Sequence, residues 1–407
     1  MEALASTRRR AAPHWELWLR RKPLMCETPG VASINRASLT LHGAFVLTGI
    51  VTTMLGPLMP ALQARWQIAD ARAGLLFTAQ FLASVCSAAA VGVLAQRFGY
   101  APLIRCGLLL AAAGVAGCAA ASWPLALLCV AVYGCGLGLL IPAGNLGIAA
   151  LHPGAESRQV MLLNLSWCAG AVAAPLLVAS LGGIFLWTLS ASIVFGAALC
   201  GAGEWPERRG GAVGPTQFGR LPLLLTSILL FLYVGTESAI GGWVALLTLR
   251  ESSAQNLWAI LPSVFWAGML AGRMVAPALL AKVRPSGLVI CGLLAAFAGA
   301  AFLIAGHGSY WSVAAGVLSG LGLAPVYPLV VAQYAELVAA DSTSGLIFSA
   351  GGLGGAALPA LVGFLSQRWG DLRTGLCLVL LCLAAMIWLQ LRLAHAFRYS
   401  GNYGISG

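Results

Sequence analysis

The chain has 407 residues, of which 60% are hydrophobic and only 9% are charged, and its mean hydropathy is +0.89. Soluble proteins carry about 25% charged residues, so this composition excludes a soluble globular protein. The formal net charge of +11 therefore has to be explained within a membrane protein.

Twelve apolar runs are long enough to cross a bilayer as helices, because about 20 apolar residues span its hydrocarbon core. The runs do not alternate apolar and polar residues, which excludes the strands of a membrane barrel. We predict an all-α membrane protein with twelve transmembrane helices in two pseudo-symmetric six-helix bundles. The predicted spans are 39–62, 71–95, 101–121, 124–151, 158–181, 184–202, 221–249, 257–281, 287–306, 311–335, 343–366 and 372–396.

The longest break between spans, at 203–220, is rich in Gly, Pro and Arg. It predicts a cytoplasmic linker between an N-terminal bundle at 38–202 and a C-terminal bundle at 221–398. Residues 1–37 contain basic clusters but no apolar core of a secretory signal, so we expect a disordered cytoplasmic segment. A start at Met25 is an alternative for its first 24 residues. Residues 399–407 are expected to form a C-terminal tail.

The positive charges predict the orientation of the chain. With the N-terminus in the cytoplasm, seventeen Lys and Arg residues lie on the cytoplasmic side of the predicted spans and five on the outer side. Cytoplasmic loops favour Lys and Arg, so we expect a multi-pass protein of the cell inner (plasma) membrane with both termini cytoplasmic. Topology and contact with anionic lipid then account for the basic charge, and no basic domain remains that would bind nucleic acid.

The eleven cysteines indicate neither a metal site nor a disulfide framework. Ten lie within predicted spans, only Cys26 lies outside, and no C-x-x-C motif is present. The chain also shows no nucleophile–base pair and no phosphate-binding glycine loop. We therefore expect no enzyme activity and no cofactor.

Three stretches of the first half recur in the second half at an offset of 184 or 185 residues. CGLLLAAAG at 106–114 matches CGLLAAFAG at 291–299, GLGL at 136–139 matches GLGL at 320–323, and GAVAAP at 170–175 matches GGAALP at 354–359. The offset equals one six-helix unit. An even number of helices gives both units the same orientation, so we expect an axis along the membrane normal to relate them.

The loop between the second and third predicted spans reads GVLAQRFG at 92–99. It resembles the G-x-L-a-D-R-x-G motif of the major facilitator superfamily (MFS), with Gly92, Arg97 and Gly99 in matching places and Gln96 in place of the aspartate. In that family the loop helps to lock one conformation through charge pairs. The resemblance therefore implies a conformational role for the matching residues and a weaker lock because of Gln96.

Two further stretches, YVGTESAIGGW at 233–243 and FWAGMLAGR at 265–273, resemble the seventh and eighth helices of the fucose-permease-like branch of that superfamily. The branch contains sugar–proton symporters, so the resemblance implies proton-coupled transport of a sugar-like solute. The acidic residues that the fucose symporter uses in its first and fourth helices have no counterpart. The first span offers only threonines there, and the fourth offers Asn145.

Glu237 is the only charged residue between Leu221 and Leu249. Ionisable residues inside a span are costly and generally face the bundle interior or a water-filled cavity. Desolvation near the bilayer midplane disfavours the charged carboxylate, so Glu237 is a candidate proton carrier. Two alternatives are a carboxylate that accepts hydrogen bonds from substrate hydroxyls and one that bonds only to a neighbouring helix.

Arg273 is a second charge inside a span, two turns before the cytoplasmic end of the eighth predicted helix. We expect a structural role, in which the side chain either reaches the inner interface or pairs with Glu336 or a backbone carbonyl. Contact with substrate is the alternative.

Uncharged polar and aromatic residues within the spans are the remaining candidates for substrate contact. Amides offer paired donors and acceptors to hydroxyl groups, and aromatic faces suit the apolar side of a sugar ring. Because Arg273 is expected off-centre and Glu237 is the only central acid, a neutral hydroxylated small molecule fits best. The candidates are Gln80, Asn145, Asn164, Trp167, Tyr233, Trp243, Trp266, Tyr327 and Gln333.

These features predict a monomeric secondary transporter that works by alternating access and couples a neutral sugar-like solute to protons. Three rivals stay open. A proton-coupled exporter of drugs or metabolites would also use one membrane acid, and an uncoupled facilitator would ignore the proton gradient. A non-transporting membrane sensor or scaffold would be expected to carry a sizeable soluble domain.

Overall fold

The computed structural model describes residues 36–200, 205, 220–251, 257–306, 308–337 and 344–400. Every regular element within them is a helix. The predicted N-terminal segment, most of the predicted linker and most of the C-terminal tail lie outside the described residues.

The first half of the chain forms one group of helices. These are α2 (Arg36–Thr53), α3 (Leu55–Trp66), α4 (Asp70–Phe98), α5 (Tyr100–Ala120), α6 (Trp123–Leu151), α7 (Glu156–Leu181) and α8 (Phe185–Leu199), with a 3₁₀ turn at Gly182–Ile184 between the last two. The second half forms a matching group. These are α9 (Arg220–Glu251), α10 (Leu257–Leu280), α11 (Pro285–Ala305), α12 (Ser309–Leu323), α13 (Val326–Leu337), α14 (Ser344–Trp369) and α15 (Leu372–Ser400).

The helices confirm the predicted membrane fold. Within the described ranges, 10 segments are long and apolar enough to cross a bilayer, and the bent pair α2–α3 makes 11. One of the 10 is the 44-residue segment Glu156–Leu199, which turns at Gly182–Ile184 and therefore supplies two spans. The total agrees with twelve transmembrane helices.

The first span is broken where the sequence predicted one continuous helix. α2 and α3 meet at Met54 with a bend of 44°. The hydroxyls of Thr52 and Thr53 donate to the carbonyls four residues earlier, a bond that often bends helices. Pro57 then removes a backbone donor within the first turn of α3. The tenth span is also interrupted, by a turn at Ala324 and Pro325 between α12 and α13.

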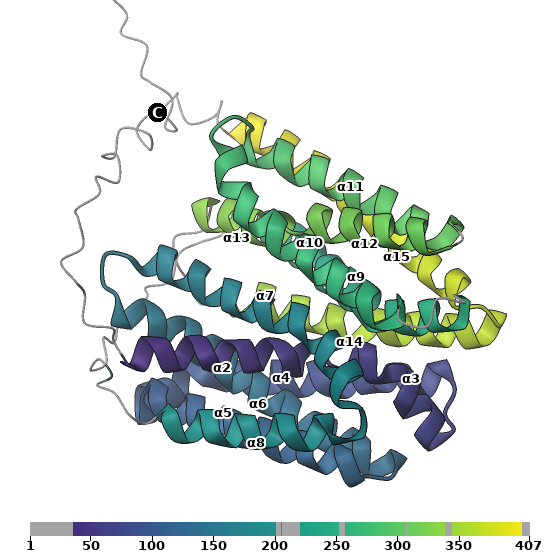
Figure 1. Ribbon diagram of the computed structural model, residues 1–407. Helices are drawn as coiled ribbons and strands as arrows, with labels where there is room; N and C mark the ends of the chain where they lie inside the picture. The colour runs from purple at the N-terminus through teal and green to yellow at the C-terminus, as the bar shows by residue number, and fades with distance from the viewer. Residues whose placement is uncertain are drawn as a thin grey trace, which may run out of the picture. The chain divides into compact units, whose positions relative to one another are not determined.

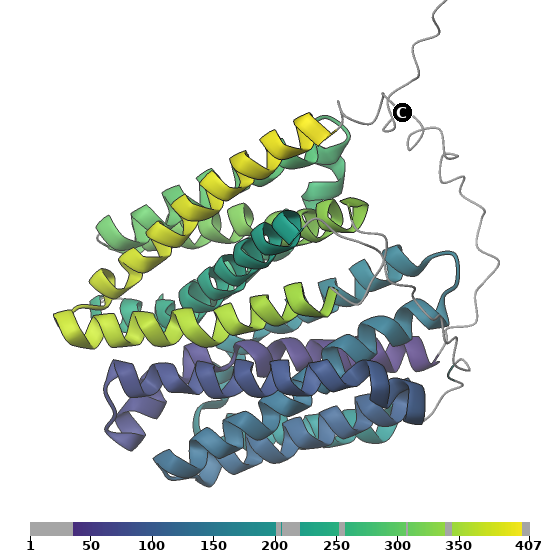
Figure 2. The same cartoon turned by 180° about the vertical axis from the view of Figure 1, so that it is seen from behind.

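The two groups of helices pack side by side, as the purple-to-teal and green-to-yellow ribbons show in both views (Figure 1, Figure 2). Helices α3, α4 and α7 of the first group contact α9, α10 and α14 of the second. The sites where charges and polar groups meet across this interface are therefore the places to search for function.

Each group contains the same close contact between its third and fourth spans. A Cβ on Gly107 of α5 would lie 2.7 Å from the carbonyl oxygen of Gly136 in α6, and one on Gly292 of α11 would lie 2.5 Å from that of Gly322 in α12. Only glycine permits such close helix packing at these positions. Glycines of the repeated stretches thus make this contact in both halves, although Gly322 matches Gly138 and not Gly136 in the repeat.

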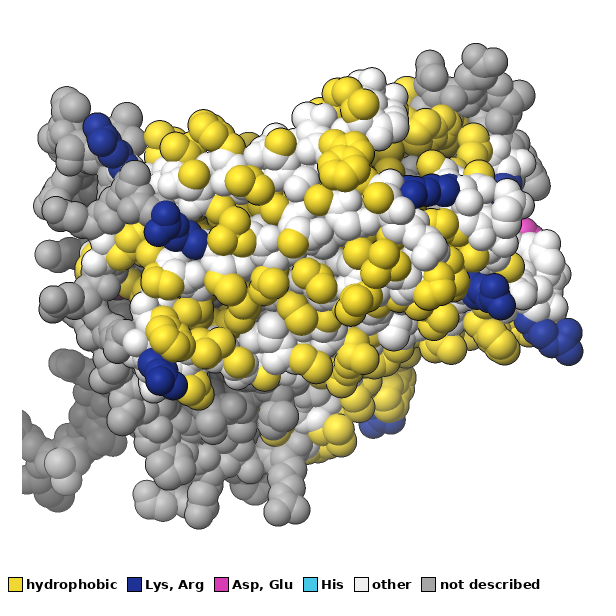
Figure 3. Space-filling model, turned by 90° about the horizontal axis from the view of Figure 1, so that it is seen from below, with side chains coloured by type: hydrophobic (Ala, Val, Ile, Leu, Met, Phe, Trp, Pro, Cys, Tyr) yellow, Lys and Arg dark blue, Asp and Glu magenta, His cyan; other side chains and the backbone are white. Residues whose placement is uncertain are grey.

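The outer surface suits a lipid environment. Figure 3 shows a largely hydrophobic face between the two ends of the helices, with Lys and Arg side chains near those ends. Large apolar side chains are exposed in both halves, such as Phe195 at 66% and Leu381 at 69%. A hydrophobic belt bounded by basic ends is what a multi-pass membrane protein presents to the bilayer.

Candidate functional site

A polar network joins the two halves at one end of the bundle, and we call it the latch. Its residues are Gln63, Asp70, Arg250, Ser366 and Gln367. Asp70 begins α4 in the first half, and Arg250 lies in the last turn of α9 in the second. The latch is therefore built from helix ends that the fold brings together across the interface.

Asp70 is the centre of the latch and has both carboxylate oxygens engaged. Arg250 donates to Oδ1 at 2.6 Å and to Oδ2 at 2.9 Å, which is bidentate geometry. Gln63 donates to Oδ1 at 2.8 Å and Ser366 to Oδ2 at 2.6 Å. The Asp70 side chain is only 8% exposed, so these bonds replace the water it has lost.

The second polar site lies near the middle of α9, about 20 Å from Arg250 at 1.5 Å per helical residue. Here Oε1 of Glu237 lies 3.9 Å from Nη2 of Arg273, which comes from α10. The two side chains are 13% and 19% exposed. At this separation the groups attract each other as charges but do not form a direct hydrogen bond.

Arg273 differs from its predicted placement, since its guanidinium points into the bundle instead of reaching the inner interface. Nη1 donates to Sγ of Cys168 in α7 at 3.1 Å, so the side chain crosses from the second half to the first. Within the described residues, Nε is buried and has no hydrogen-bond acceptor. Arg273 therefore lies at the centre of this site, and not displaced from it toward the inner interface.

Aromatic rings from both halves surround this pair. Cζ of Arg273 lies 6.0 Å from the ring centroid of Trp167, which packs edge-on against Trp266 at 5.7 Å. The rings of Tyr233 and Tyr327 lie 5.6 Å apart, within electrostatic range of Glu237. The structure thus brings together the predicted residues Glu237, Trp167, Tyr233, Trp266 and Tyr327, and adds Arg273 and Cys168.

Other predicted residues have their polar atoms bonded to residues outside this cluster, although Thr52, one partner of Gln80, also accepts from the Trp167 indole N–H at 3.4 Å. Gln80 is 1% exposed, donates to the Thr52 carbonyl at 3.2 Å and accepts from the Tyr133 hydroxyl at 3.0 Å. Trp243 is fully buried, and its indole N–H donates to the Pro359 carbonyl at 2.9 Å. Both residues hold neighbouring helices together.

The remaining amides bond to one another. Asn164 of α7 donates to the side-chain oxygen of Asn145 in α6 at 2.9 Å, and both stay partly exposed. Gln333 of α13 accepts from Gln390 of α15 at 3.2 Å. Their amides therefore link helices within one half, and a substrate would have to compete with those bonds.

Most of the motif predicted as a loop is helical, because residues 92–98 end α4 and only Gly99 connects α4 to α5. Gly99 separates α4 from α5 and has φ +83°, a conformation that favours glycine. Arg97 lies in the last turn of α4 with its guanidinium 5.3 Å from the Phe98 ring, and Gly92 is exposed on the same helix. Their conformational role stays a prediction.

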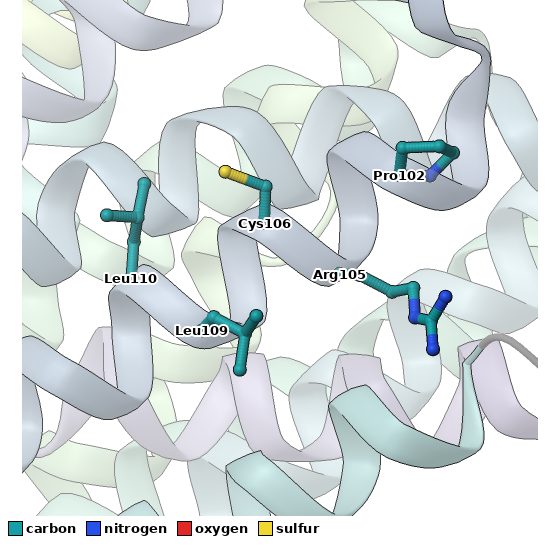
Figure 4. A pocket seen from close by; sticks show the side chains of 5 residues that line it. All are labelled: Pro102, Arg105, Cys106, Leu109 and Leu110. Atoms are coloured by element: carbon teal, nitrogen blue, oxygen red, sulfur yellow. The ribbon is translucent and has the colours of Figure 1, made fainter.

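Two surface hollows do not contain the central cluster. One is a groove along α5, lined by Pro102, Arg105, Cys106, Leu109 and Leu110 (Figure 4). All five residues come from one helix, and Arg105 donates to the Ala197 carbonyl of α8 at 3.3 Å. The other lies near the ends of α3 and α10 and has a largely apolar lining. Neither offers the convergent polar groups of the central cluster.

Sequence reasoning missed the latch altogether. Asp70 was the available signal, because it is an acid that begins an apolar helix whereas Arg250 ends another. The pairing joins residues 180 positions apart, so no local pattern connects them. Cys168 was also missed as a partner of Arg273, since a lone cysteine in an apolar span looks like a packing residue.

A protein-family comparison matches residues 41–359 to the Major Facilitator Superfamily. No curated protein matches the chain. Because the family match covers most of the sequence, the chain belongs to the major facilitator superfamily.

Solved structures of transporters share the fold at low sequence identity. The E. coli fucose:proton symporter FucP is 19% identical, covers 87% of this chain and 97% of its own, and has a TM-score of 0.61. The nucleoside transporter NupG is 13% identical, with coverage of 88% and 98% and a TM-score of 0.73. A D-xylose–proton symporter is 13% identical, with coverage of 86% and 96% and a TM-score of 0.70. This membrane protein is thus a transporter by family and fold.

Proposed function

We propose that this member of the superfamily is a proton-coupled symporter of a small, hydroxylated, sugar-like solute, with Glu237 as the proton-binding group. The observation that carries the proposal is the loose pair of Glu237 and Arg273, 3.9 Å apart and bridged to the other half through Cys168. Ionisable groups placed this deep in a membrane helix generally belong to substrate or proton pathways.

Coupling follows from the chemistry of the pair. When Glu237 takes a proton, it loses the charge that holds Arg273, so the guanidinium becomes available to a solute. The edge-on pair of Trp167 and Trp266 supplies apolar walls next to that group. Loading therefore changes the contacts that Arg273 makes across the two halves, and those contacts are what a rocking motion has to alter.

In this motion, the latch is the contact that closes one end of the bundle. It ties α4 to α9 and α14 at the end of the bundle that the positive-charge pattern assigns to the outside. We accordingly place both termini in the cytoplasm and the protein in the cell inner membrane, acting as a monomer. In this orientation the described conformation is closed to the outside.

Two transport alternatives remain as outcomes of the test. An exporter of drugs or metabolites would move its substrate outward while protons move inward down their gradient. A facilitator would equilibrate a solute across the membrane whether or not a proton gradient is present. The nucleoside transporter among the similar folds makes hydroxylated solutes other than simple sugars worth including in the screen.

The test uses the full chain reconstituted into liposomes. Labelled neutral sugars, nucleosides and sugar acids are offered with and without an inward proton gradient, to wild type, Glu237→Gln and the control Glu156→Gln. Glu156 begins α7 and accepts from the Gly154 backbone N–H, so its variant makes the same chemical change away from the pair.

The proposal predicts that a solute accumulates only with the gradient in wild type and in Glu156→Gln. Glu237→Gln should still exchange that solute across the membrane but should not concentrate it. Uptake that ignores the proton gradient would contradict the proposal in favour of a facilitator. Gradient-driven loss of a preloaded solute would contradict it in favour of an exporter.

A further inference from the structure

The guanidinium of Arg273 has unused hydrogen-bonding capacity. It carries five N–H donors in a planar fork. Among the described residues, one donor bonds to the thiol of Cys168, a weak acceptor, and Nε has no acceptor although it is buried. The Tyr233 hydroxyl lies within electrostatic range of the guanidinium but forms no hydrogen bond to a described residue, and Glu237 stays 3.9 Å away. A buried arginine left this way indicates an acceptor that arrives from outside the chain.

Charge balance restricts what that acceptor is. Among the described residues, this site holds one negative and one positive group, Glu237 and Arg273, so their net charge is zero. The other titratable groups that face the pair are Cys168, Tyr233 and Tyr327, and all three are neutral in their ordinary forms. Protonation of Glu237 therefore leaves one uncompensated positive charge in an environment where an unpaired charge is costly.

A neutral sugar would leave that charge uncompensated, whereas a solute with one carboxylate would cancel it. We infer that the transported solute is a hydroxylated monocarboxylate of the sugar-acid class, whose carboxylate binds Arg273 while a proton occupies Glu237. This inference rests on the proposed function, because it requires Glu237 to carry the proton. It replaces the neutral solute predicted from sequence, for which an off-centre Arg273 was the premise.

The recognition chemistry agrees with this class. An arginine fork binds a carboxylate through two parallel N–H···O bonds, a geometry that a hydroxyl cannot reproduce. Beside it, Trp167 and Trp266 offer aromatic faces for the C–H side of a sugar chain or ring. The tyrosine pair Tyr233 and Tyr327 lies within electrostatic range of both charged groups.

Transport of a sugar acid with a proton differs electrically from transport of a neutral sugar with a proton. One proton and one carboxylate together carry no net charge, so the membrane potential should neither drive nor oppose their movement. A proton that moves with a neutral sugar carries one positive charge, and its uptake should accelerate with an inside-negative potential.

The experiment measures uptake of labelled gluconate and glucuronate, with glucose and fucose as neutral partners, into liposomes containing the full chain. A pH gradient and a potassium-diffusion potential are imposed separately. The variants are Arg273→Gln, Arg273→Lys and the control Arg392→Gln, which removes an exposed arginine stacked on Trp388 of α15. Quenching of tryptophan fluorescence by gluconate measures binding in detergent and does not require transport.

We expect a sugar acid to accumulate at least tenfold with the pH gradient and to be unaffected by the potential. Arg273→Gln should lose both uptake and fluorescence quenching, Arg273→Lys should bind at least tenfold more weakly, and Arg392→Gln should behave as wild type. If Arg273→Gln fails to fold, Arg273→Lys and the potential dependence still decide the question.

Two results would overturn the inference in different ways. If a neutral sugar accumulates with the proton gradient, responds to the potential, and sugar acids do not move, the charged solute is wrong and the proposed function stands. If neither class responds to the proton gradient, the inference fails together with the proposed function.

Discussion

The latch and the central pair use the same two kinds of charged group in opposite ways. In the latch, both oxygens of Asp70 are saturated by donors at 2.6–2.9 Å from Arg250, Gln63 and Ser366. In the central pair, Glu237 and Arg273 stay 3.9 Å apart, and the guanidinium keeps a donor that has no acceptor in the part of the chain that the structure describes. A saturated pair holds two elements together, whereas we propose that the unsaturated pair remains available for a proton and a solute.

This difference gives the two sites separable roles. Changes at the latch should alter how often the outer end opens and leave solute chemistry intact. Changes at the central pair should alter proton and solute binding. Added solute should restore the stability that such changes remove. Substitutions at the two places can therefore be ranked by the size and type of their effects.

The largest effect is expected where α3 of the first half touches α9 of the second, between the central pair and the latch. A Cβ on Gly56 of α3 would overlap the Gly241 carbonyl of α9, so Gly56→Ala forces the halves apart. We expect a cost to the closed conformation of about 3 kcal/mol, the upper part of the range for overpacking. Hydrogen–deuterium exchange at the first turns of α4 should increase. Gly43→Ala, which meets nothing within 4 Å, should show no such increase.

The next effect concerns the latch charge itself. Asp70→Asn removes the charge-assisted bonds from Arg250 and should shift the opening equilibrium by about 2 kcal/mol, or roughly 30-fold, since Arg250 is partly exposed. Amide exchange at the start of α4 and the end of α14 measures this shift, and Arg368→Gln serves as the control. If exchange stays at the wild-type level in Asp70→Asn, the latch does not hold the end closed.

Without added solute, Glu237→Gln should lower the free energy of unfolding by about 1–2 kcal/mol, because Arg273 loses its only charge partner among the described residues. Unlike the latch variant, it should recover when gluconate supplies a new negative partner. Thermal unfolding with and without gluconate tests this. Equal recovery of Asp70→Asn and Glu237→Gln would remove the distinction between the two sites.

The smallest effect is expected at Gln80, which sequence reasoning placed among the substrate candidates. Gln80→Leu leaves the buried Tyr133 hydroxyl without its acceptor, so stability should fall by about 1 kcal/mol. The KM of gradient-driven uptake should not change. A KM that rises several-fold with unchanged stability would instead make Gln80 a substrate contact.

The length and composition of the apolar runs predicted the spans, because a bilayer requires long apolar helices regardless of which helices pack beside them. They also located Glu237, since an acid in an apolar run is visible without a structure. The break at Met54 was not predicted, although Thr52, Thr53 and Pro57 carry its cause in hindsight. Each of these residues is tolerated in an unbroken membrane helix, so only the packing decides.

Long-range pairings account for the rest of what the sequence did not predict. Arg273 lies 36 positions from Glu237 and 105 from Cys168, and its long side chain can point toward the interface or the interior. Gln80 and Trp243 looked equally suitable as cavity residues, yet their polar atoms are used by Tyr133 and Pro359. Helical position alone does not reveal which polar groups are already satisfied.

The central claim is that Glu237 takes up a proton when a solute occupies Arg273. The most direct measurement is the number of protons bound from a weakly buffered detergent solution as gluconate, or glucose if gluconate does not bind, is added. The account predicts about one proton bound per solute in wild type and none in Glu237→Gln. Solute binding with no proton uptake in wild type, or with the same uptake in both proteins, would contradict it.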